Sequence, residues 1–155
     1  MIITLTPNTG IDHTVEIPGF RLNSTIRAID SAWGMGGKAT DVSWTLGKLG
    51  IPTRALGFAA GPNGVRMEKM LRERGVETDF VWVDGETRLN SIIVVPGEGQ
   101  STITSSSLNV ALEHLSADAF TRVAGNPGIA GNLRPGVLGR SHSDSDQAGE
   151  SDQGG

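Results

Sequence analysis

The chain has 155 residues, no cysteine and a formal net charge of −4. This length suits one domain of ordinary size, and the lack of cysteine excludes disulfides, thiolate zinc sites and a cysteine nucleophile. Residues 141–155 hold four acidic side chains and no Lys or Arg, so the rest of the chain is neutral. A neutral body without a basic stripe argues against nucleic acid as a partner. No apolar run approaches the roughly 20 residues of a membrane span, no signal-peptide pattern is present, and a cytoplasmic location is expected.

The first part of the chain has the patterns of strands. Residues 2–6 form a β-branched run that stops at a Pro-Asn-Thr-Gly turn, which predicts a buried strand. Residues 13–17 alternate polar and apolar side chains, as a half-exposed strand does. Residues 25–33 are predicted as a third strand, closed by the glycine-rich residues 34–37.

Two helices and a strand are predicted next. The apolar residues of the first helix recur at steps of three and four, which places them on one face: Ala39, Val42, Leu46 and Leu49. Gly50 ends this helix, and residues 53–60 are predicted as a strand. After a Gly-Pro-Asn-Gly turn, residues 65–74 suit a short helix with Gly75 as its C-cap.

Strand patterns return in the second half of the chain. Residues 79–83 are predicted as a strand, and residues 88–95 and 101–105 as a hairpin. A last helix is predicted over residues 110–123. Strand and helix alternate twice, which favours an α/β fold with a parallel sheet. The additional alternating strands do not fit a simple sheet and indicate a small β subdomain beside it.

The division of the chain follows its composition. We expect residues 1–123 to form one domain and residues 124–155 to form a tail. This tail is first rich in glycine and proline and then acidic. Because its last fifteen residues hold one apolar side chain, Ala148, they cannot offset the entropy of becoming ordered, and we expect the tail to be disordered.

A glycine-rich loop carries the first candidate site. Gly34-Met35-Gly36-Gly37-Lys38 stands between a predicted strand and the start of a predicted helix. Free backbone amides and the positive end of the helix dipole would meet an anion there, and Lys38 adds a full positive charge. These features suit a hydroxyl-rich anionic ligand such as a sugar phosphate. The alternative is a tight turn in which the glycines only supply positive φ angles.

Three ordered segments resemble a known family. The segments Thr6-Pro7-Asn8-Thr9-Gly10-Ile11-Asp12, Gly36-Gly37-Lys38-Ala39-Thr40-Asp41-Val42 and Gly85-Glu86-Thr87-Arg88-Leu89-Asn90 resemble motifs of the ribokinase/PfkB carbohydrate kinases. The branch they resemble most is that of 1-phosphofructokinase and tagatose-6-phosphate kinase. The resemblance covers roughly residues 1–105. It implies a ribokinase-like α/β domain with an inserted β lid, incomplete at the C-terminus, and a substrate held between the two parts.

The resemblance also implies a set of substrate-binding residues: Asp12, Gly36, Gly37, Lys38, Asp41, Arg88 and Asn90. Asp12 would accept hydrogen bonds from sugar hydroxyls, and Gly36 and Gly37 would let the backbone approach the sugar. Lys38, Arg88 and a further candidate, Arg27, would hold the phosphate of the substrate.

Each of these positions has a plain alternative. Asp12 could cap a turn, and Arg88 could be a solvated strand residue. Lys38 and Asp41 could be ordinary charges in the first turn of a helix.

Two positions of the loop depart from the family pattern, which usually reads Gly-Gly-Lys-Gly-x-Asn. Ala39 adds a methyl group where the backbone should approach the ligand closely. Asp41 replaces an amide with an anion that only accepts hydrogen bonds. If Asp41 faces the pocket, it repels a phosphate. We therefore expect a lower affinity or a different preferred sugar.

The residues needed for phosphoryl transfer are the part of the family pattern that this sequence matches least. The resemblance implies ATP and Mg²⁺ as cofactors, together with a C-terminal Gly-Ala-Gly-Asp motif that supplies an anion hole and a base. No Gly-x-Gly-Asp occurs in this chain. We therefore assign no catalytic and no metal-binding residue, and expect no kinase activity from the chain alone. Three interpretations stay open: a truncated gene product, a standalone module that binds a sugar phosphate or forms a homodimer through its β lid, and one half of a two-chain kinase.

Overall fold

The computed structural model describes residues 1–108 and residue 110. Its elements follow in the order β1 (Ile2–Thr6), β2 (Gly10–Glu16), β3 (Asp30–Gly36), α1 (Lys38–Lys48), β4 (Thr53–Ala59), α2 (Gly61–Arg72), β5 (Glu77–Trp82), β6 (Arg88–Val95) and β7 (Gly99–Thr104). They form two sheets, which we call the α/β layer (β1, β4, β5 and both helices) and the lid (β3, β2, β6 and β7).

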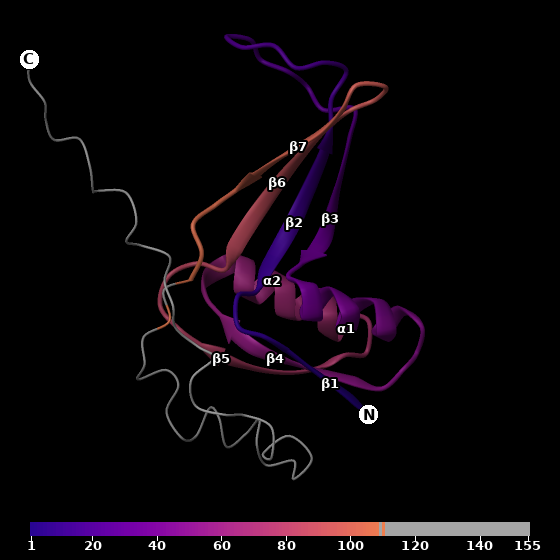
Figure 1. Cartoon of the computed structure of the whole chain (residues 1–155), viewed down its shortest axis with the longest axis vertical. Helices are drawn as coiled ribbons and strands as arrows, with labels where there is room; N and C mark the ends of the chain where they lie inside the picture. The colour runs from indigo at the N-terminus through magenta and orange to yellow at the C-terminus, as the bar shows by residue number, and fades with distance from the viewer. Residues whose placement is uncertain (109, 111–155) are drawn as a thin grey trace, which may run out of the picture.

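The α/β layer is a three-stranded parallel sheet in the order β1-β4-β5. The connection from β1 to β4 runs through β2, β3 and then α1, and α2 joins β4 to β5. Each crossover thus contains a helix, as is usual for parallel pairs. Both helices lie on the side of this sheet that faces the lid (Figure 1). Helix α1 packs on β1 and β4 and touches β3, while α2 packs on β5 and touches β2.

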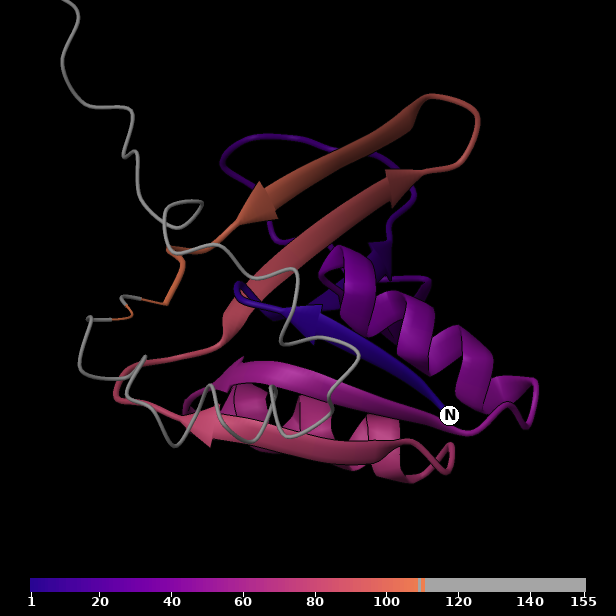
Figure 2. The ribbon, with the colours of Figure 1, turned by 60° about the horizontal axis from the view of Figure 1, so that its bottom comes forward.

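The lid is a four-stranded sheet in the order β3-β2-β6-β7. Strand β2 pairs with β3 in antiparallel and with β6 in parallel orientation. The β6–β7 hairpin extends past the α/β layer, so its tip stands away from the layer in both views (Figures 1 and 2). The surplus alternating strands of the sequence thus form a subdomain of their own, as predicted.

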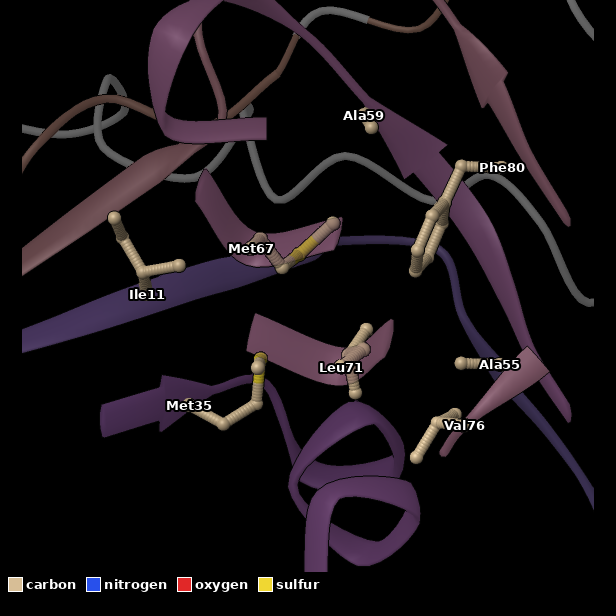
Figure 3. Packing of buried hydrophobic residues seen from close by; sticks show 8 residues of the cluster. All are labelled: Ile11, Met35, Ala55, Ala59, Met67, Leu71, Val76 and Phe80. Atoms are coloured by element: carbon tan, nitrogen blue, oxygen red, sulfur yellow. The ribbon is translucent and has the colours of Figure 1, made fainter. Parts of the chain in front are cut away.

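The main hydrophobic core lies where the lid meets the layer. Its members come from both parts: Ile11, Met35, Ala55, Ala59, Met67, Leu71, Val76 and Phe80. In Figure 3, Met67 and Leu71 of α2 occupy the middle of this cluster. Both side chains are fully buried. Helix α2 therefore joins the base of the lid to the parallel sheet.

Most predicted elements are confirmed. The predicted bounds of β2, β5 and β7 differ from the observed ones by one to three residues, and those of β3 and α2 differ more. Strand β3 begins at Asp30 rather than residue 25, and it includes Gly34 and Gly36, which were predicted to close it. Helix α2 begins at Gly61, so the predicted Gly-Pro-Asn-Gly turn is its first helical turn. Proline is compatible with that position because the first turn of a helix does not use its backbone N–H groups.

The inward face of α1 also differs from the prediction. Val42 and Leu49 are 50% and 66% exposed, whereas Thr40 and Ser43 are fully buried. Ser43 shares a 2.6 Å hydrogen bond with Thr4 of β1. Small polar side chains thus contribute the most buried positions of α1, and the predicted apolar face of this helix is only half-buried at Ala39 and Leu46.

Apart from residue 110, the predicted helix at 110–123 lies outside the described residues, as does the predicted tail at 124–155. The division of the chain into these two parts remains a prediction. Within the described residues, no helix is long and apolar enough to cross a membrane.

Candidate functional site

Two polar side chains meet on neighbouring strands at the base of the lid. Asp12 of β2 is paired in register with Asn90 of β6. The Asn90 Nδ2 donates a 2.6 Å hydrogen bond to Oδ1 of Asp12. Both residues are only half-buried. The second carboxylate oxygen of Asp12 makes no hydrogen bond within the described residues, so it can accept one from a ligand.

Gly36 provides the space in which this pair meets. A Cβ atom added at Gly36 would lie 2.6 Å from Oδ1 of Asp12 and 3.2 Å from Nδ2 of Asn90. Any larger residue there would displace one of the two side chains. The next residue, Gly37, has a φ of 85° and forms the N-cap of α1. Glycine tolerates this left-handed conformation at no steric cost.

Arg88 lies beside the pair, at the start of β6. Its side chain runs over Gly10, where an added Cβ would lie 3.1 Å from Nε of Arg88. The Nε is buried and has no hydrogen-bond partner within the described residues. Because an unsatisfied buried donor is costly, it marks a place where an acceptor is expected.

Lys38 and Asp41 occupy the first turn of α1, and both are exposed. Neither side chain makes an ion pair within the described residues. The N-terminus of α1 also has no side-chain cap. Helix α1 thus begins two residues after Gly36, and the side chain of Lys38 at its N-terminus is open to solvent.

Arg27 is not part of this cluster. It is exposed and belongs to the loop between β2 and β3, which lies at the end of the lid away from the helices (Figure 1). By contrast, Arg88 begins β6 two residues before Asn90, and Lys38 directly follows Gly37 in the chain.

Several polar and aromatic contacts of this region were missed by sequence reasoning. The hydroxyls of Thr6 and Thr40 are buried without a partner within the described residues. Trp33 stacks on the ring of His13, with 4.2 Å between the centroids, and the guanidinium of Arg66 lies 4.1 Å from the Trp33 ring. Both partners of Trp33 are distant from it in sequence, so no local pattern predicts these contacts.

The described part of the chain contains no cluster of potential metal-binding side chains. No group of three His, Cys, Asp or Glu side chains lies close enough there to hold a metal ion.

Curated proteins that resemble this chain include two 1-phosphofructokinases and a D-tagatose-1-phosphate kinase. A 1-phosphofructokinase of Borreliella burgdorferi is 33% identical over 111 residues, which cover 72% of this chain and 36% of that protein. A 1-phosphofructokinase of Haloferax volcanii is 29% identical and covers 88% of this chain and 46% of its own length. A D-tagatose-1-phosphate kinase of Bacillus licheniformis is 37% identical over 93 residues, which are 60% of this chain and 31% of that protein. The chain thus spans less than half the length of these curated relatives.

Solved structures agree with this fold. A candidate 1-phosphofructokinase of Thermotoga maritima is 31% identical and superimposes with a TM-score of 0.69 over 79% of this chain and 40% of its own. Phosphofructokinase-2 of Escherichia coli, solved in complex with substrates and products, has a TM-score of 0.66 over 79% of this chain and 38% of its own. At 21% identity, this second likeness shows the fold alone.

The family described as pfkB family carbohydrate kinase matches residues 9–122 of the chain. This range includes β2 to β7 and all of the polar cluster at the base of the lid. The predicted ribokinase-like fold is confirmed, with its parallel sheet and its lid, and so is the predicted family. The chain belongs to the pfkB family of carbohydrate kinases.

Proposed function

We propose that this chain provides the hexose-phosphate site of an ATP-dependent sugar-phosphate kinase. The observation that carries the proposal is the buried, unpartnered Nε of Arg88 beside the Asp12–Asn90 pair. A donor for phosphate and an acceptor for hydroxyls lie on adjacent strands, and a phosphorylated sugar needs both. The similarity to 1-phosphofructokinases and to a D-tagatose-1-phosphate kinase supports a ketose phosphate as the substrate.

Each side chain has a chemical role in this proposal. The Asp12 carboxylate accepts hydrogen bonds from sugar hydroxyls, and its contact with Asn90 holds it in one orientation. Arg88 presents paired N–H donors that match the geometry of a phosphate. Lys38 adds positive charge at the open N-terminus of α1. Gly36 leaves room for Asp12 and Asn90 to meet.

Asp41 should lower the affinity of the site for a sugar phosphate. Its exposed carboxylate lies in the same helical turn as Lys38. At that position it cancels part of the positive potential of the helix N-terminus, although solvent screens much of the effect. Replacing Asp41 with Asn should therefore strengthen the binding of a sugar phosphate.

The kinase reaction itself requires more than this site. Phosphoryl transfer needs a bound nucleotide, Mg²⁺ and a base for the attacking hydroxyl. The sequence contains no Gly-x-Gly-Asp motif, and the chain covers 31% to 46% of the relatives' lengths. We infer that the chain alone binds the sugar phosphate without turning it over. Purified chain should release no ADP above background from ATP and fructose 1-phosphate in a coupled assay, and turnover would contradict this inference.

The binding proposal is tested by calorimetric titration of the purified chain with fructose 1-phosphate, fructose 6-phosphate and tagatose 1-phosphate. Free fructose and inorganic phosphate serve as ligand controls. The matched variants are Arg88→Gln and Arg54→Gln, since Arg54 is an exposed arginine of β4 that pairs with Glu77 away from the site. We expect binding of a ketose phosphate that Arg88→Gln weakens at least tenfold and Arg54→Gln leaves unchanged. Absence of binding, or equal effects of both variants, would refute the proposal.

Two alternative functions differ in their need for a partner. In a two-chain kinase, a polypeptide carrying the rest of the family fold restores ADP release when it is added to this chain. In a binding module, the sugar phosphate binds with the same affinity but no added segment restores turnover. The titration and the ADP assay together separate these cases. The proposal places the protein in the cytoplasm, where ATP and sugar phosphates would both be available.

A homodimer formed through the lid is part of the same proposal. Apolar side chains on the lid line a shallow groove of about 330 Å³ together with the β6–β7 turn: Phe20, Ile93, Val95 and Ile103. Phe20 is 58% exposed and Ile103 62% exposed, and covering them would remove apolar surface from water. One structure of phosphofructokinase-2 of Escherichia coli is described as tetrameric. A second copy of this chain is the proposed occupant, and sedimentation equilibrium measures whether it binds.

A further inference from the structure

The N-terminus of α2 lacks a cap of its own. Its N-cap residue is Ala60, which has no side-chain hydrogen-bonding group, and its first turn contains no acidic residue. The first backbone N–H groups of a helix need acceptors from elsewhere. In this structure they come from residues 86 and 87, which lie between β5 and β6 and far along the chain from α2.

Glu86 supplies the first acceptor and a negative charge. Its Oε1 accepts a 2.7 Å hydrogen bond from the backbone N–H of Asn63. The carboxylate thus interacts favourably with the positive end of the helix dipole. It also lies directly against the helix backbone, because a Cβ added at Gly61 would be 2.5 Å from Oε2 of Glu86. Gly61 has a φ of 59°, so two separate reasons favour glycine there.

Thr87 completes the connection and is fully buried. Its Oγ1 accepts a 2.9 Å hydrogen bond from the N–H of Ala60, and its own N–H donates to the Ala60 carbonyl at 3.0 Å. Its carbonyl accepts from Nδ2 of Asn63 at 3.1 Å. Every backbone polar group of Thr87 is therefore bound to the first turn of α2 or to the residue before it. We call Glu86 and Thr87 together the α2 clamp.

The residue after the α2 clamp is Arg88, the proposed phosphate ligand. Its Nε is buried, and its carbonyl and side chain lie close over Gly10, so there is little room for it to shift. We propose that Glu86 and Thr87 are positioning residues, which hold the start of β6 on α2 and so aim Arg88 at the phosphate of the substrate. This inference rests on the proposed function. A small displacement of a positioned group can cost a large factor in binding or rate.

A purely structural role is the competing explanation. In that case the α2 clamp would stabilise α2, and its loss would lower the melting temperature without changing the geometry of Arg88. The two roles differ in one observable, which is the environment of the Arg88 side chain. The ¹H–¹⁵N signal of Arg88 Nε reports this environment directly and can be assigned from its absence in Arg88→Lys.

The experiment compares conservative and disruptive variants of the full chain. Thr87→Ser keeps the hydroxyl and Thr87→Val removes it, while Glu86→Gln keeps an acceptor oxygen without the charge and Glu86→Ala removes both. Glu77→Ala is the matched control, because it deletes an exposed glutamate that pairs with Arg54 in the α/β layer. The readouts are the affinity for fructose 1-phosphate, the Arg88 Nε signal and the melting temperature.

We expect Glu86→Ala and Thr87→Val to weaken binding by about fivefold or more, the factor expected if the loss of a helix cap is transmitted to the site. The Arg88 signal should shift in both variants. Thr87→Ser should retain the wild-type affinity, Glu86→Gln should lie in between, and Glu77→Ala should change neither the affinity nor the signal.

Some outcomes would overturn the inference. A lower melting temperature with unchanged affinity and an unchanged Arg88 signal would leave the α2 clamp a cap of the helix only. If Thr87→Val does not fold, Glu86→Ala decides, since it removes the acceptor of the Asn63 N–H at an exposed position and leaves the buried Thr87 intact. If the wild-type chain binds no sugar phosphate, the proposed function fails. The Arg88 signal in the Glu86 variants then still decides whether the clamp positions Arg88.

Discussion

The central strand of the α/β layer and the edge strand of the lid are buried to very different extents. Strand β4, in the middle of the layer, is buried at six of its seven positions. Strand β7, at the edge of the lid, is exposed at all six. Strand β6 is half-buried along its whole length. The layer thus has a hydrophobic interior, whereas the outer part of the lid depends on its hydrogen-bonded pairing and on its base.

This difference explains where the candidate site lies. Ile11 and Met35 fasten the base of the lid into the core, and Asp12 and Gly36 are their direct neighbours in the chain. The site residues therefore combine a rigid support with a sheet that is open to solvent. A ligand held at this boundary can gain contacts from the lid without disturbing the layer.

The largest effect on stability is expected inside the layer. Leu71→Ala removes a fully buried side chain from the middle of the core. Substitutions of this kind cost about 2–5 kcal/mol because they leave a cavity as well as losing apolar contacts. Denaturant unfolding followed by circular dichroism measures the change. A loss below about 1 kcal/mol would mean that this core does not carry the stability of the fold.

A smaller effect on stability, with a large effect on binding, is expected at the boundary. In Gly36→Ala the new methyl group would meet Asp12 and Asn90 and separate them. The affinity for a ketose phosphate should fall about tenfold or more, which corresponds to about 1.4 kcal/mol. Titration calorimetry measures it. Gly19→Ala is the matched control, since its Cβ would have no atom within 4 Å, and equal affinities of the two variants would contradict the expectation.

The sequence was sufficient for the elements of both regions but not for all of their contacts. Alternating strands and the β6–β7 hairpin follow from local patterns, and so does the βα order of the layer. The inward face of α1 could not be predicted, because Ser43 is chosen by a hydrogen bond to Thr4 rather than by its hydrophobicity. The start of α2 was missed for a related reason, since its cap comes from Glu86, 25 residues further along the chain than Gly61.

The same distinction holds within the candidate site. Asp12, Gly36 and Asn90 belong to three motifs that are distant in sequence. The strand register pairs Asp12 with Asn90, and both of their side chains lie over Gly36. The resemblance to a family could therefore identify these residues as members of one site, whereas their spacing in the sequence could not show that they lie close together. The unpartnered state of the Arg88 Nε follows from burial, which depends on the packing of Gly10 against that side chain.

The smallest effect on stability is expected at the edge of the lid. Ile103 is 62% exposed on β7, so Ile103→Ser should change the free energy of unfolding of a monomer by no more than about 0.5 kcal/mol. Its effect on association should be larger, because Ile103 lines the apolar groove assigned to a second copy of the chain. Sedimentation equilibrium should give a weaker dimer for Ile103→Ser and an unchanged one for Val65→Ser, an equally exposed site on α2. If both variants associate like the wild-type chain, the apolar groove of the lid does not form the dimer interface.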